Sequence, residues 1–589
     1  MSEHKVNVLP NDIEIYVAHN TSLKEAFIEN GLNFEFQCGG TGVCKQCKVK
    51  IIKNTGQEEV LACQLKVIED LTVEIPVKSN KHRILATGIE RQVKLNPIIK
   101  KSYIQAPNPS LEDNRDDWSR ITAETKMART NLKVLQELPE KLRENNFNIT
   151  AVTSFDEIIA IENQDTRKEL LGMAFDIGTT TIAGYLLNLE SGEEIARVSA
   201  LNPQTKYGAD LISRIVYASQ TPNGLEKLHK ELIEQLNGLI AQAVNSTGYT
   251  PIDVYAVTAA GNTAMHHLLL KIQPRNLAGS PYVPVVVQQV TVNAAELNLK
   301  INPAGRLFAL PNIAGYVGGD TVAATLVSQM YKDDKLKLLI DIGTNGEIVL
   351  GNSKKLISCS VAAGPAFEGV QIKCGMRGDE GAIDHVFIGE EFKYTVIGER
   401  QPLGIAGSGI VDMVAELLKA GIVDSSGRIL KPEKITNNLG IKHKERLKNI
   451  DDVMAFIICE NVETGKIIYI NQKDIREFQL AKGAIAAGIE VLLKEYGAIA
   501  DDIDEVFLAG AFGSYLKHEN VCRVGMIPQE LLDRITSIGN GAGAGAKLIM
   551  LSEEEYKRSE TLSKMIKYVE LSVHPLFNGI FLNKIRFNI

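Results

Sequence analysis

Two stretches of this 589-residue chain nearly repeat each other, and they restrict its possible folds more than any other feature. In each, an apolar run ends in Asp-Ile-Gly-Thr, which begins at Asp176 in the first copy and at Asp341 in the second. A further apolar run follows each copy, so we predict two β-hairpins whose tips carry Asp, Gly and hydroxyl side chains. Asp-x-Gly is also common turn chemistry, but two copies in the same strand context favour a shared function.

The residues of both predicted tips suit the binding of a nucleoside triphosphate. Glycine lets backbone N–H groups approach phosphate, threonine adds hydroxyl donors, and aspartate can hold a hydrated Mg²⁺ ion. Two such tips facing each other would hold the phosphates from both sides. The tip residues predicted to bind the nucleotide are Gly178, Thr179, Thr180, Gly343, Thr344, Asn345 and Gly346.

The pair of tips resembles the two phosphate loops of the ATPase fold shared by actin, sugar kinases and heat-shock chaperones (ASKHA). Between the tips, residues 318–324 open an Ala-rich helix similar to the one that connects the two lobes of that fold. In the fold this helix carries an acid near the metal and the attacking water, which here is Asp320. The resemblance implies that Asp176, Asp320 and Asp341 surround a Mg-ATP site, and it leaves open which of them orients the water.

Two later motifs extend this resemblance. Residues 506–514 are a strand running into a Gly-rich turn, similar to the adenosine-binding motif of the fold, with Gly510 and Gly513 as the nucleotide-binding positions. Residues 543–546 resemble the closing helix that follows that motif. The match covers roughly residues 171–550.

Four cysteines near the N-terminus, Cys38, Cys44, Cys47 and Cys63, have the spacing C-x5-C-x2-C-x15-C. Four thiolates can hold a [2Fe-2S] cluster, and the glycines between the first two allow the loop to curl around it. The unit resembles a plant-type ferredoxin domain, although the first spacing is one residue longer than usual and the last is short. A structural zinc site is the alternative. The scattered cysteines Cys359, Cys374, Cys459 and Cys522 are interpreted as buried small hydrophobes.

Smaller features lie between the landmarks. Residues 202–204 and 208–210 are interpreted as a loop that reaches a partner, and residues 404–409 as a Gly-rich loop that holds a phosphate or packs tightly. A helix after Asn262 has either a plain cap or an N-terminus that faces the cleft.

The predicted fold is multidomain, α+β and α/β. An N-terminal β-grasp ferredoxin-like domain precedes a linker, a small middle domain and a C-terminal two-lobed, actin-like (ribonuclease H-like) ATPase domain. The predicted boundaries are 1–80 for the [2Fe-2S] domain, 81–122 for the linker, 123–170 for the connecting or dimerising middle domain, and 171–589 for the ATPase, with lobes of about 171–335 and 336–589.

The composition supports a soluble, folded protein. Apolar residues make up 44% and charged residues 23%, and the net charge of −8 argues against nucleic acid as the main partner. The N-terminus has no apolar leader, and the apolar window at 478–493 contains Lys482 and Glu490. We therefore expect a cytoplasmic protein that does not bind membranes.

The ordered set of domains resembles the reductive activators of corrinoid proteins in anaerobic methyl-transfer metabolism. This resemblance implies ATP-dependent transfer of one electron from a [2Fe-2S] cluster to Co(II) cobamide. It also implies a corrinoid protein as partner, reduced ferredoxin or a similar electron donor, Mg²⁺ with the ATP, and a homodimer. The alternatives are an ATP-driven activator of another metalloenzyme, a chaperone-like ATPase with a sensory cluster, and a sugar or acid kinase. A chaperone would need a peptide-binding β-domain after the ATPase, and only a short segment follows residue 550.

Overall fold

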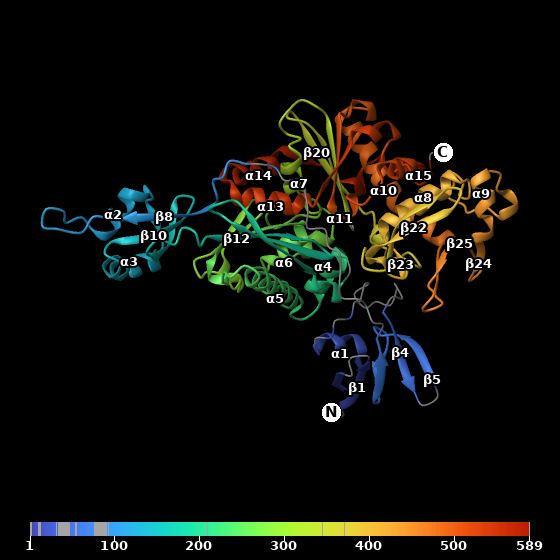
Figure 1. Ribbon diagram of the computed structural model, residues 1–589, viewed down its shortest axis with the longest axis horizontal. Helices are drawn as coiled ribbons and strands as arrows, with labels where there is room; N and C mark the ends of the chain where they lie inside the picture. The colour runs from blue at the N-terminus through green and yellow to red at the C-terminus, as the bar shows by residue number, and fades with distance from the viewer. Residues whose placement is uncertain are drawn as a thin grey trace.

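The computed structural model describes most of the chain, and it confirms the predicted order and class of the domains (Figure 1). The described residues are 3–9, 13–30, 32, 34, 47–53, 56–75, 91, 93–208, 210–343, 345–369 and 371–587. Within them, no helix has both the length and the apolar character needed to cross a membrane.

The ferredoxin-like domain is a twisted sheet with one helix on its face, at the bottom of Figure 1. Its elements are β1 (Glu3–Leu9), β2 (Ile13–Ala18), β3 (Thr21–Ser22), α1 (Leu23–Glu29), β4 (Lys48–Lys53), β5 (Gly56–Leu61), β6 (Lys66–Val67) and β7 (Leu71–Glu74). The strand order is β2-β1-β7-β4-β5, with β1 and β7 parallel. Alternate residues of β1, Val6 and Val8, are buried against Phe27 of α1, as the period of a half-buried strand requires.

The small middle domain projects from the body at the left of Figure 1. Its elements are β8 (Ile99–Gln105), α2 (Asp117–Thr125), β9 (Arg129–Thr130), α3 (Leu132–Glu144), β10 (Asn148–Ser154) and β11 (Glu157–Asn163), with strand order β8-β10-β11-β9. The sequence interpretation placed residues 81–122 in a linker, but β8 and α2 are packed parts of this domain. Ile104 and Ile121 are buried in its core, so the Pro-containing segment between them is a surface loop within the domain.

Lobe one of the ATPase is built on a sheet of order β14-β13-β12-β15-β17-β16. Its elements are β12 (Leu171–Ile177), β13 (Thr181–Asn188), β14 (Glu194–Leu201), α4 (Leu211–Gln220), α5 (Gly224–Asn245), β15 (Val254–Gly261), α6 (Thr263–Leu269), β16 (Val290–Asn293), β17 (Arg306–Ala309) and α7 (Gly319–Ser328). The central strand β12 pairs antiparallel with β13 and parallel with β15. All eight residues of β15 are buried because helices cover both faces of the sheet.

Lobe two repeats this plan with the order β28-β27-β18-β19-β20-β29 and carries an outer subdomain at the right of Figure 1. Its sheet consists of β18 (Lys337–Ile342), β19 (Gly346–Gly351), β20 (Leu356–Val361), β27 (Glu505–Ala509), β28 (Ile535–Gly539) and β29 (Ile566–Tyr568). The outer strands are β21 (Ala382–Ile388), β22 (Phe392–Val396), β23 (Gly404–Ile405), β24 (Leu447–Ile450), β25 (Val453–Glu460) and β26 (Ile467–Asn471). The helices are α8 (Gly407–Lys419), α9 (Asn438–His443), α10 (Gln472–Tyr496), α11 (Gly510–Gly513), α12 (His518–Arg523), α13 (Gly541–Leu551), α14 (Glu553–Met565) and α15 (Phe577–Lys584).

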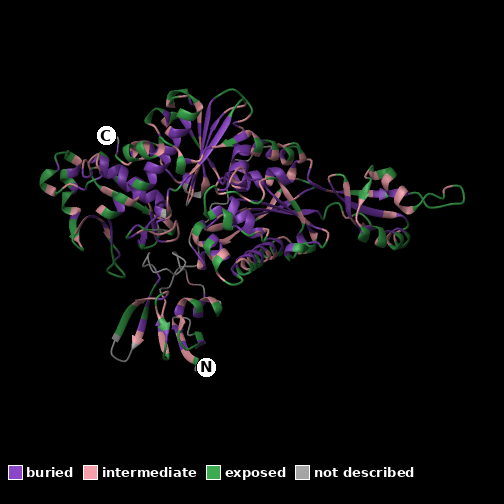
Figure 2. Ribbon diagram, turned by 180° about the vertical axis from the view of Figure 1, so that it is seen from behind, coloured by how far each residue is buried: buried purple, intermediate pink, exposed green. Residues whose placement is uncertain are grey.

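The two lobes meet where α7 and α13 lie against each other, in a region that is largely buried (Figure 2). Glycines of α13 make this approach possible, since a Cβ on Gly545 would lie 2.5 Å from the carbonyl oxygen of Ala323. A Cβ on Gly543 would lie 2.6 Å from the Tyr185 ring. The closing helix predicted from residues 543–546 is therefore present, and its small residues serve close helix packing.

Candidate active site

Both predicted hairpins are present, and each places its aspartate at the carboxyl end of a central strand. Asp176 is the penultimate residue of β12, and Asp341 is the penultimate residue of β18. In the first turn the Gly178 N–H donates to the Thr181 carbonyl at 2.9 Å. A Cβ on Gly178 would lie 2.7 Å from that same oxygen, so this turn requires glycine.

The two tips face a shared cleft of about 300 Å³ between the lobes. Most of the predicted site residues line it: Asp176, Gly178, Thr179, Thr180, Asp320, Asp341, Gly343, Asn345 and Gly510. Gly346 begins β19 and packs against Val361, and Gly513 packs against Leu508, so neither lines the cleft. Thr344 lies outside the described residues.

Polar groups behind the first tip hold its backbone in place. Asn202 hydrogen-bonds two backbone carbonyls of the tip: its Nδ2 donates to Gly178 O at 2.8 Å, and its N–H donates to Thr180 O at 2.8 Å. The buried Arg214 guanidinium donates to Thr179 O, and burial lowers the pKa of this group to about 9. The loop that the sequence interpretation assigned to a partner therefore supports the phosphate tip. Arg214, on α4 just after that loop, brings a buried cation close behind the tip.

Two further contacts of the first tip involve side chains across from it. Asn262, the N-cap of α6, donates from Nδ2 to Thr179 Oγ1 at 3.1 Å and lines the cleft. The Thr180 hydroxyl donates to Glu368 Oε2 of lobe two at 3.1 Å. Thr180 thus links the two lobes directly at the mouth of the cleft.

The second tip is supported in a different way. Gly510, the first residue after β27, has φ of +87°, and a Cβ there would lie 2.5 Å from Asp341 Oδ1. Only glycine fits this position without displacing the carboxylate. On the same side of the cleft, Gly407 and Ser408 at the start of α8 and Tyr515 after α11 complete its wall.

Glu347 is a further carboxylate of the cleft that the sequence analysis missed, and Glu368, Asp379 and Asp384 also line it. Glu347 lies directly opposite Asp341 in the β18–β19 pairing and lines the cleft. Residues directly opposite on antiparallel strands have neighbouring side chains. The sequence does show an acid after the Asp341 turn. To infer that this acid faces Asp341, one would need to know the length of the turn.

The four acids repel one another inside a buried site. Burial raises the pKa of Asp176 to about 7, with a further contribution from Asp320 and an opposing hydrogen bond from Asn540. Burial together with Asp320 and Asp176 raises the pKa of Asp341 to about 7. The pKa values of Asp320 and Glu347 are raised for the same primary reason. A cation between the acids would remove this repulsion.

The geometry favours a cation held through water over one ligated directly. Among the described residues no group of three or more His, Cys, Asp or Glu side chains is close enough to ligate a metal ion. Mg²⁺ commonly keeps several waters and takes its other ligands from substrate phosphates. The acids of this cleft therefore fit a hydrated Mg²⁺ that arrives with a nucleotide.

The described cysteines of the N-terminal motif fit a metal cluster. Cys47 and Cys63 are not joined by a disulfide, because their Sγ atoms lie 3.2 Å apart, much longer than the roughly 2.05 Å of such a bond. Cys47 directly precedes β4 and is buried, whereas Cys63 is half-buried. Two sulfurs this close can contact the same metal ion. Cys38 and Cys44 lie outside the described residues.

Three of the four remaining cysteines are buried as the sequence analysis expected, whereas Cys459 is only half-buried. Cys359, Cys374 and Cys522 are buried, and burial raises the pKa of each thiol.

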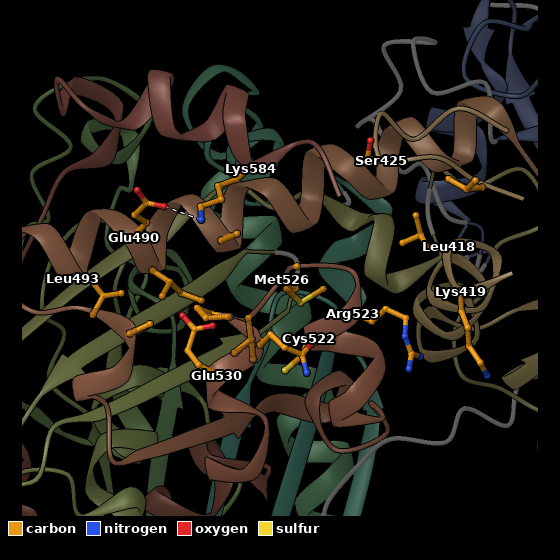
Figure 3. A pocket seen from close by; sticks show the side chains of 18 of the residues that line it. Leu418, Lys419, Ser425, Glu490, Leu493, Cys522, Arg523, Met526, Glu530 and Lys584 are labelled. Carbon is orange, nitrogen blue, oxygen red and sulfur yellow. Dashed lines mark ion pairs between the residues drawn. The ribbon is translucent and has the colours of Figure 1, made fainter. Parts of the chain in front are cut away.

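A second and larger hollow, of about 1020 Å³, lies in lobe two among α8, α10 and the residues after α12 (Figure 3). Apolar side chains such as Leu493 and Met526 form much of its wall. Two charged groups at its edge pair with each other, with Lys584 Nζ 2.8 Å from Glu490 Oε2. It contains none of the predicted site residues, which gather instead in the smaller cleft with the acids.

Family models match almost the whole chain in four successive parts. They are described as the 2Fe-2S iron-sulfur cluster binding domain (residues 6–67), the RACo linker region (88–168), the RACo middle region (171–333) and the C-terminal domain of RACo, the ASKHA domain (335–588).

Individual relatives agree with these matches. The corrinoid activation enzyme RamQ of Eubacterium limosum is 33% identical over 575 residues, which cover 96% of each chain. A Co(II) methylated amine-specific corrinoid protein reductase of Methanosarcina barkeri is 24% identical and covers 70% of this chain and 76% of its own. The solved structure of a reductive activator for corrinoid, iron-sulfur protein has a TM-score of 0.77, at 34% identity, and covers 99% of this chain and 98% of its own.

Proposed function

We propose, for a chain that belongs to the family of RACo-type reductive activators of corrinoid proteins, that it uses ATP to return a partner's Co(II) corrinoid to Co(I). The observation that supports this most directly is the combination on one chain of two converging cysteine sulfurs and a two-lobed cleft whose lining includes the half-buried acids Asp176, Asp320, Asp341 and Glu347. A downhill electron relay would need no ATPase.

Cys38, Cys44, Cys47 and Cys63 would hold a [2Fe-2S] cluster, with Cys47 and Cys63 already side by side. When bound, such a cluster supplies a single low-potential electron, which here reduces Co(II) to Co(I) and must be replaced by an outside donor such as reduced ferredoxin. If Co(II) lies below the roughly −400 mV of plant-type clusters, the transfer is uphill, by about 2.3 kcal/mol per 100 mV. Conformational change driven by a nucleotide can supply energy of that order.

In the ATPase, the backbone of the first tip and the Thr179 hydroxyl bind the phosphates, and the Thr180 hydroxyl joins them by turning from Glu368. Asp176 and Asp341, from opposite lobes, would hold a hydrated Mg²⁺, which would neutralise charge on the phosphates. Of the other acids, Glu347 or Asp320 accepts a hydrogen bond from the attacking water. Closure of the lobes excludes bulk water and strengthens these contacts.

The partner's state must be recognised as well as the nucleotide. A conformational change shifts an equilibrium only through differential binding to the two states. The activator is therefore expected to bind the Co(II) form of the corrinoid protein more tightly than the Co(I) or methylated form. A homodimer remains a prediction, to be checked by measuring the mass of the protein in solution.

The deciding experiment mixes reduced activator with a Co(II) corrinoid protein of the same organism and follows Co(I) absorbance with and without ATP. We expect Co(I) to form only with ATP and not with Asp341→Asn. Asp533→Asn, which changes an exposed acid of lobe two outside the cleft, serves as the matched control. Equal Co(I) yields with and without ATP would refute the coupling.

A separate measurement tests the cluster. Protein purified without oxygen is expected to hold two irons and two sulfides per chain, as a [2Fe-2S] cluster requires. Cys47→Ser and Cys63→Ser should lose them, and the buried Cys359→Ser should keep them. Stoichiometric zinc without sulfide would favour the structural zinc site instead.

A further inference from the structure

The two helices that join the lobes both begin at the nucleotide cleft. Asp320 lies in the first turn of α7 and lines the cleft. Asn540 is the N-cap of α13, and its Nδ2 donates to Asp176 Oδ2 at 2.9 Å while its Oδ1 accepts from the Gly543 N–H. The N-terminal end of α7 thus carries one acid of the site, and the N-cap of α13 is hydrogen-bonded to another.

The opposite end of α13 holds the segment through which the ferredoxin-like domain is attached. This tether segment consists of Arg91 and residues 93–98, and it follows the ferredoxin-like domain in the chain. The Asn96 N–H donates to Leu551 O at 2.9 Å, and the Ile98 N–H donates to Met550 O at 3.1 Å. The Glu553 N–H returns a bond to Asn96 O at 2.9 Å. The tether segment is therefore hydrogen-bonded to the backbone where α13 ends and α14 begins, with an isolated parallel bridge between Asn96 and Ser552.

Arg91 fixes the same segment to the C-terminal part of α7. Its guanidinium donates to both carboxylate oxygens of Glu555 on α14, at 2.5 and 3.0 Å, and to Leu326 O of α7 at 3.2 Å. The two side chains are only 11% and 6% exposed. A buried, two-pronged arginine–carboxylate pair sets position strongly, because its geometry is fixed and a lone partner would be left as a buried charge.

Stiff helices connect these two ends. An α-helix rises about 1.5 Å per residue, so α7 and α13 each span roughly 15 Å between the cleft and the tether segment. Their contact is made through small residues, with Gly541 and Gly545 against Ala324 and Ala323. Such a contact has no side chains that interlock deeply, so one helix can slide past the other when the lobes close.

We propose that α7 and α13 transmit the occupancy of the nucleotide cleft to the tether segment, and that Arg91 and Glu555 are the positioning residues that couple ATP to placement of the electron-carrying domain. This inference rests on the proposed function for its purpose. Its mechanical part, a nucleotide-dependent change at the tether segment, can be measured without any corrinoid partner.

Hydrogen exchange tests the mechanical part directly. The amides of Asn96 and Ile98, which donate to α13, are compared by mass spectrometry in protein bound to ADP and to a non-hydrolysable ATP analogue. We expect their exchange rates to differ by about tenfold between the two nucleotides, within the usual range of coupling between sites. Equal exchange with both nucleotides would overturn the inference, whatever the protein does with a corrinoid partner.

Arg91→Met tests the coupling contact. It is expected to abolish the nucleotide dependence at Asn96 and Ile98 and to lower ATP-dependent Co(I) formation about tenfold. ATP hydrolysis should stay within about twofold of wild type, because Arg91 does not line the cleft. Arg129→Met, which breaks an exposed ion pair with Asp156 in the middle domain, is the matched control and should change none of these quantities.

Two further variants keep the inference testable if Arg91→Met does not fold. Glu555→Gln keeps the shape of the side chain and should give the same uncoupling. Asn540→Ala acts from the other end and should remove the nucleotide dependence of exchange at Asn96, some 15 Å away along α13. Unchanged exchange behaviour in both variants would contradict the proposed path. If wild-type protein shows the exchange difference but forms no Co(I), the proposed function fails and the mechanical inference stands.

Discussion

The two lobes share a similar strand plan but differ at the residue that faces the aspartate of each hairpin. In lobe one Asp176 lies opposite Ala183, and in lobe two Asp341 lies opposite Glu347. Behind the first tip a buried arginine and an asparagine hold the backbone, whereas behind the second a glycine leaves room for the carboxylate. On the proposed function, the difference predicts that lobe one mainly holds phosphate and that lobe two supplies the chemistry.

The aspartates themselves should give the largest effects. Asp341→Asn is expected to lower ATP hydrolysis about 10²–10³-fold, the usual cost of losing one electrostatic contact in a closed site. Asp176→Asn should also be severely impaired. Because both residues are far from the cysteines in the chain, the visible spectrum of the cluster should be unchanged. Steady-state phosphate release measures the rate, and unaltered hydrolysis in both variants would refute the site.

Glu347→Gln should give the next largest effect, and it distinguishes the roles of the two lobes. If the acid opposite Asp341 serves the chemistry, this variant should bind ATP normally and hydrolyse it about 10²-fold more slowly, the contribution typical of a positioned acid or base. Ala183→Ser changes the equivalent position of lobe one and should have little effect. Titration with a fluorescent ATP analogue measures binding, and phosphate release measures turnover. A Glu347→Gln variant with normal turnover would assign the water to Asp320.

Glu347 also marks the limit of what the sequence could predict. The two hairpins, their aspartates and most of the tip residues that line the cleft followed from the repeated motif. The facing residue did not, because Ile342 pairs with Gly346 whereas Ile177 pairs with Ile182, so the second turn is one residue shorter. A one-residue change in a turn reverses which side chains share a face, and turn length is not evident from the apolar pattern.

The supporting groups were missed or misassigned for a related reason. Asn202 and Arg214 support the first tip although they lie well after it in the chain. Nothing in the local sequence distinguishes them from residues of an ordinary surface loop. The middle domain was divided because a Pro-containing segment lies between β8 and α2, although buried Ile104 and Ile121 belong to one core. Local composition predicted the segment's irregularity correctly, but not the packing on either side of it.

The acids of both lobes should make Mg²⁺ binding depend on pH. Asp176 and Asp341 have folded-state pKa values raised to about 7, so without a cation they are largely protonated at pH 6 and ionised at pH 8. Since Mg²⁺ must displace those protons, its affinity should rise about tenfold or more over this interval. Isothermal titration at the two pH values measures this change, and Asp176→Asn should flatten it.

The same shifts predict the pH dependence of stability. Because each pKa is raised above its unfolded value of 3.8, the folded state binds more protons than the unfolded state between about pH 4 and 7. Metal-free protein should therefore lose stability as the pH rises through this window, and Mg²⁺ with nucleotide should restore it. Melting temperatures that do not depend on pH without metal would contradict the assigned repulsion.

The smallest expected effect concerns the close contact between α7 and α13, where the two lobes meet. Gly545→Ala would place a Cβ 2.5 Å from Ala323 O, so α13 must shift away from α7. Overpacking of this kind costs about 1–3 kcal/mol, and we expect a lower melting temperature with slower ATP turnover. Gly238→Ala in α5 is the matched control, because no atom lies within 4 Å of its new Cβ. In a helix interior alanine is better than glycine by about 0.8–1.0 kcal/mol, so this variant should be slightly more stable than wild type. If both variants melt alike, the close contact of α7 and α13 does not restrain the lobes.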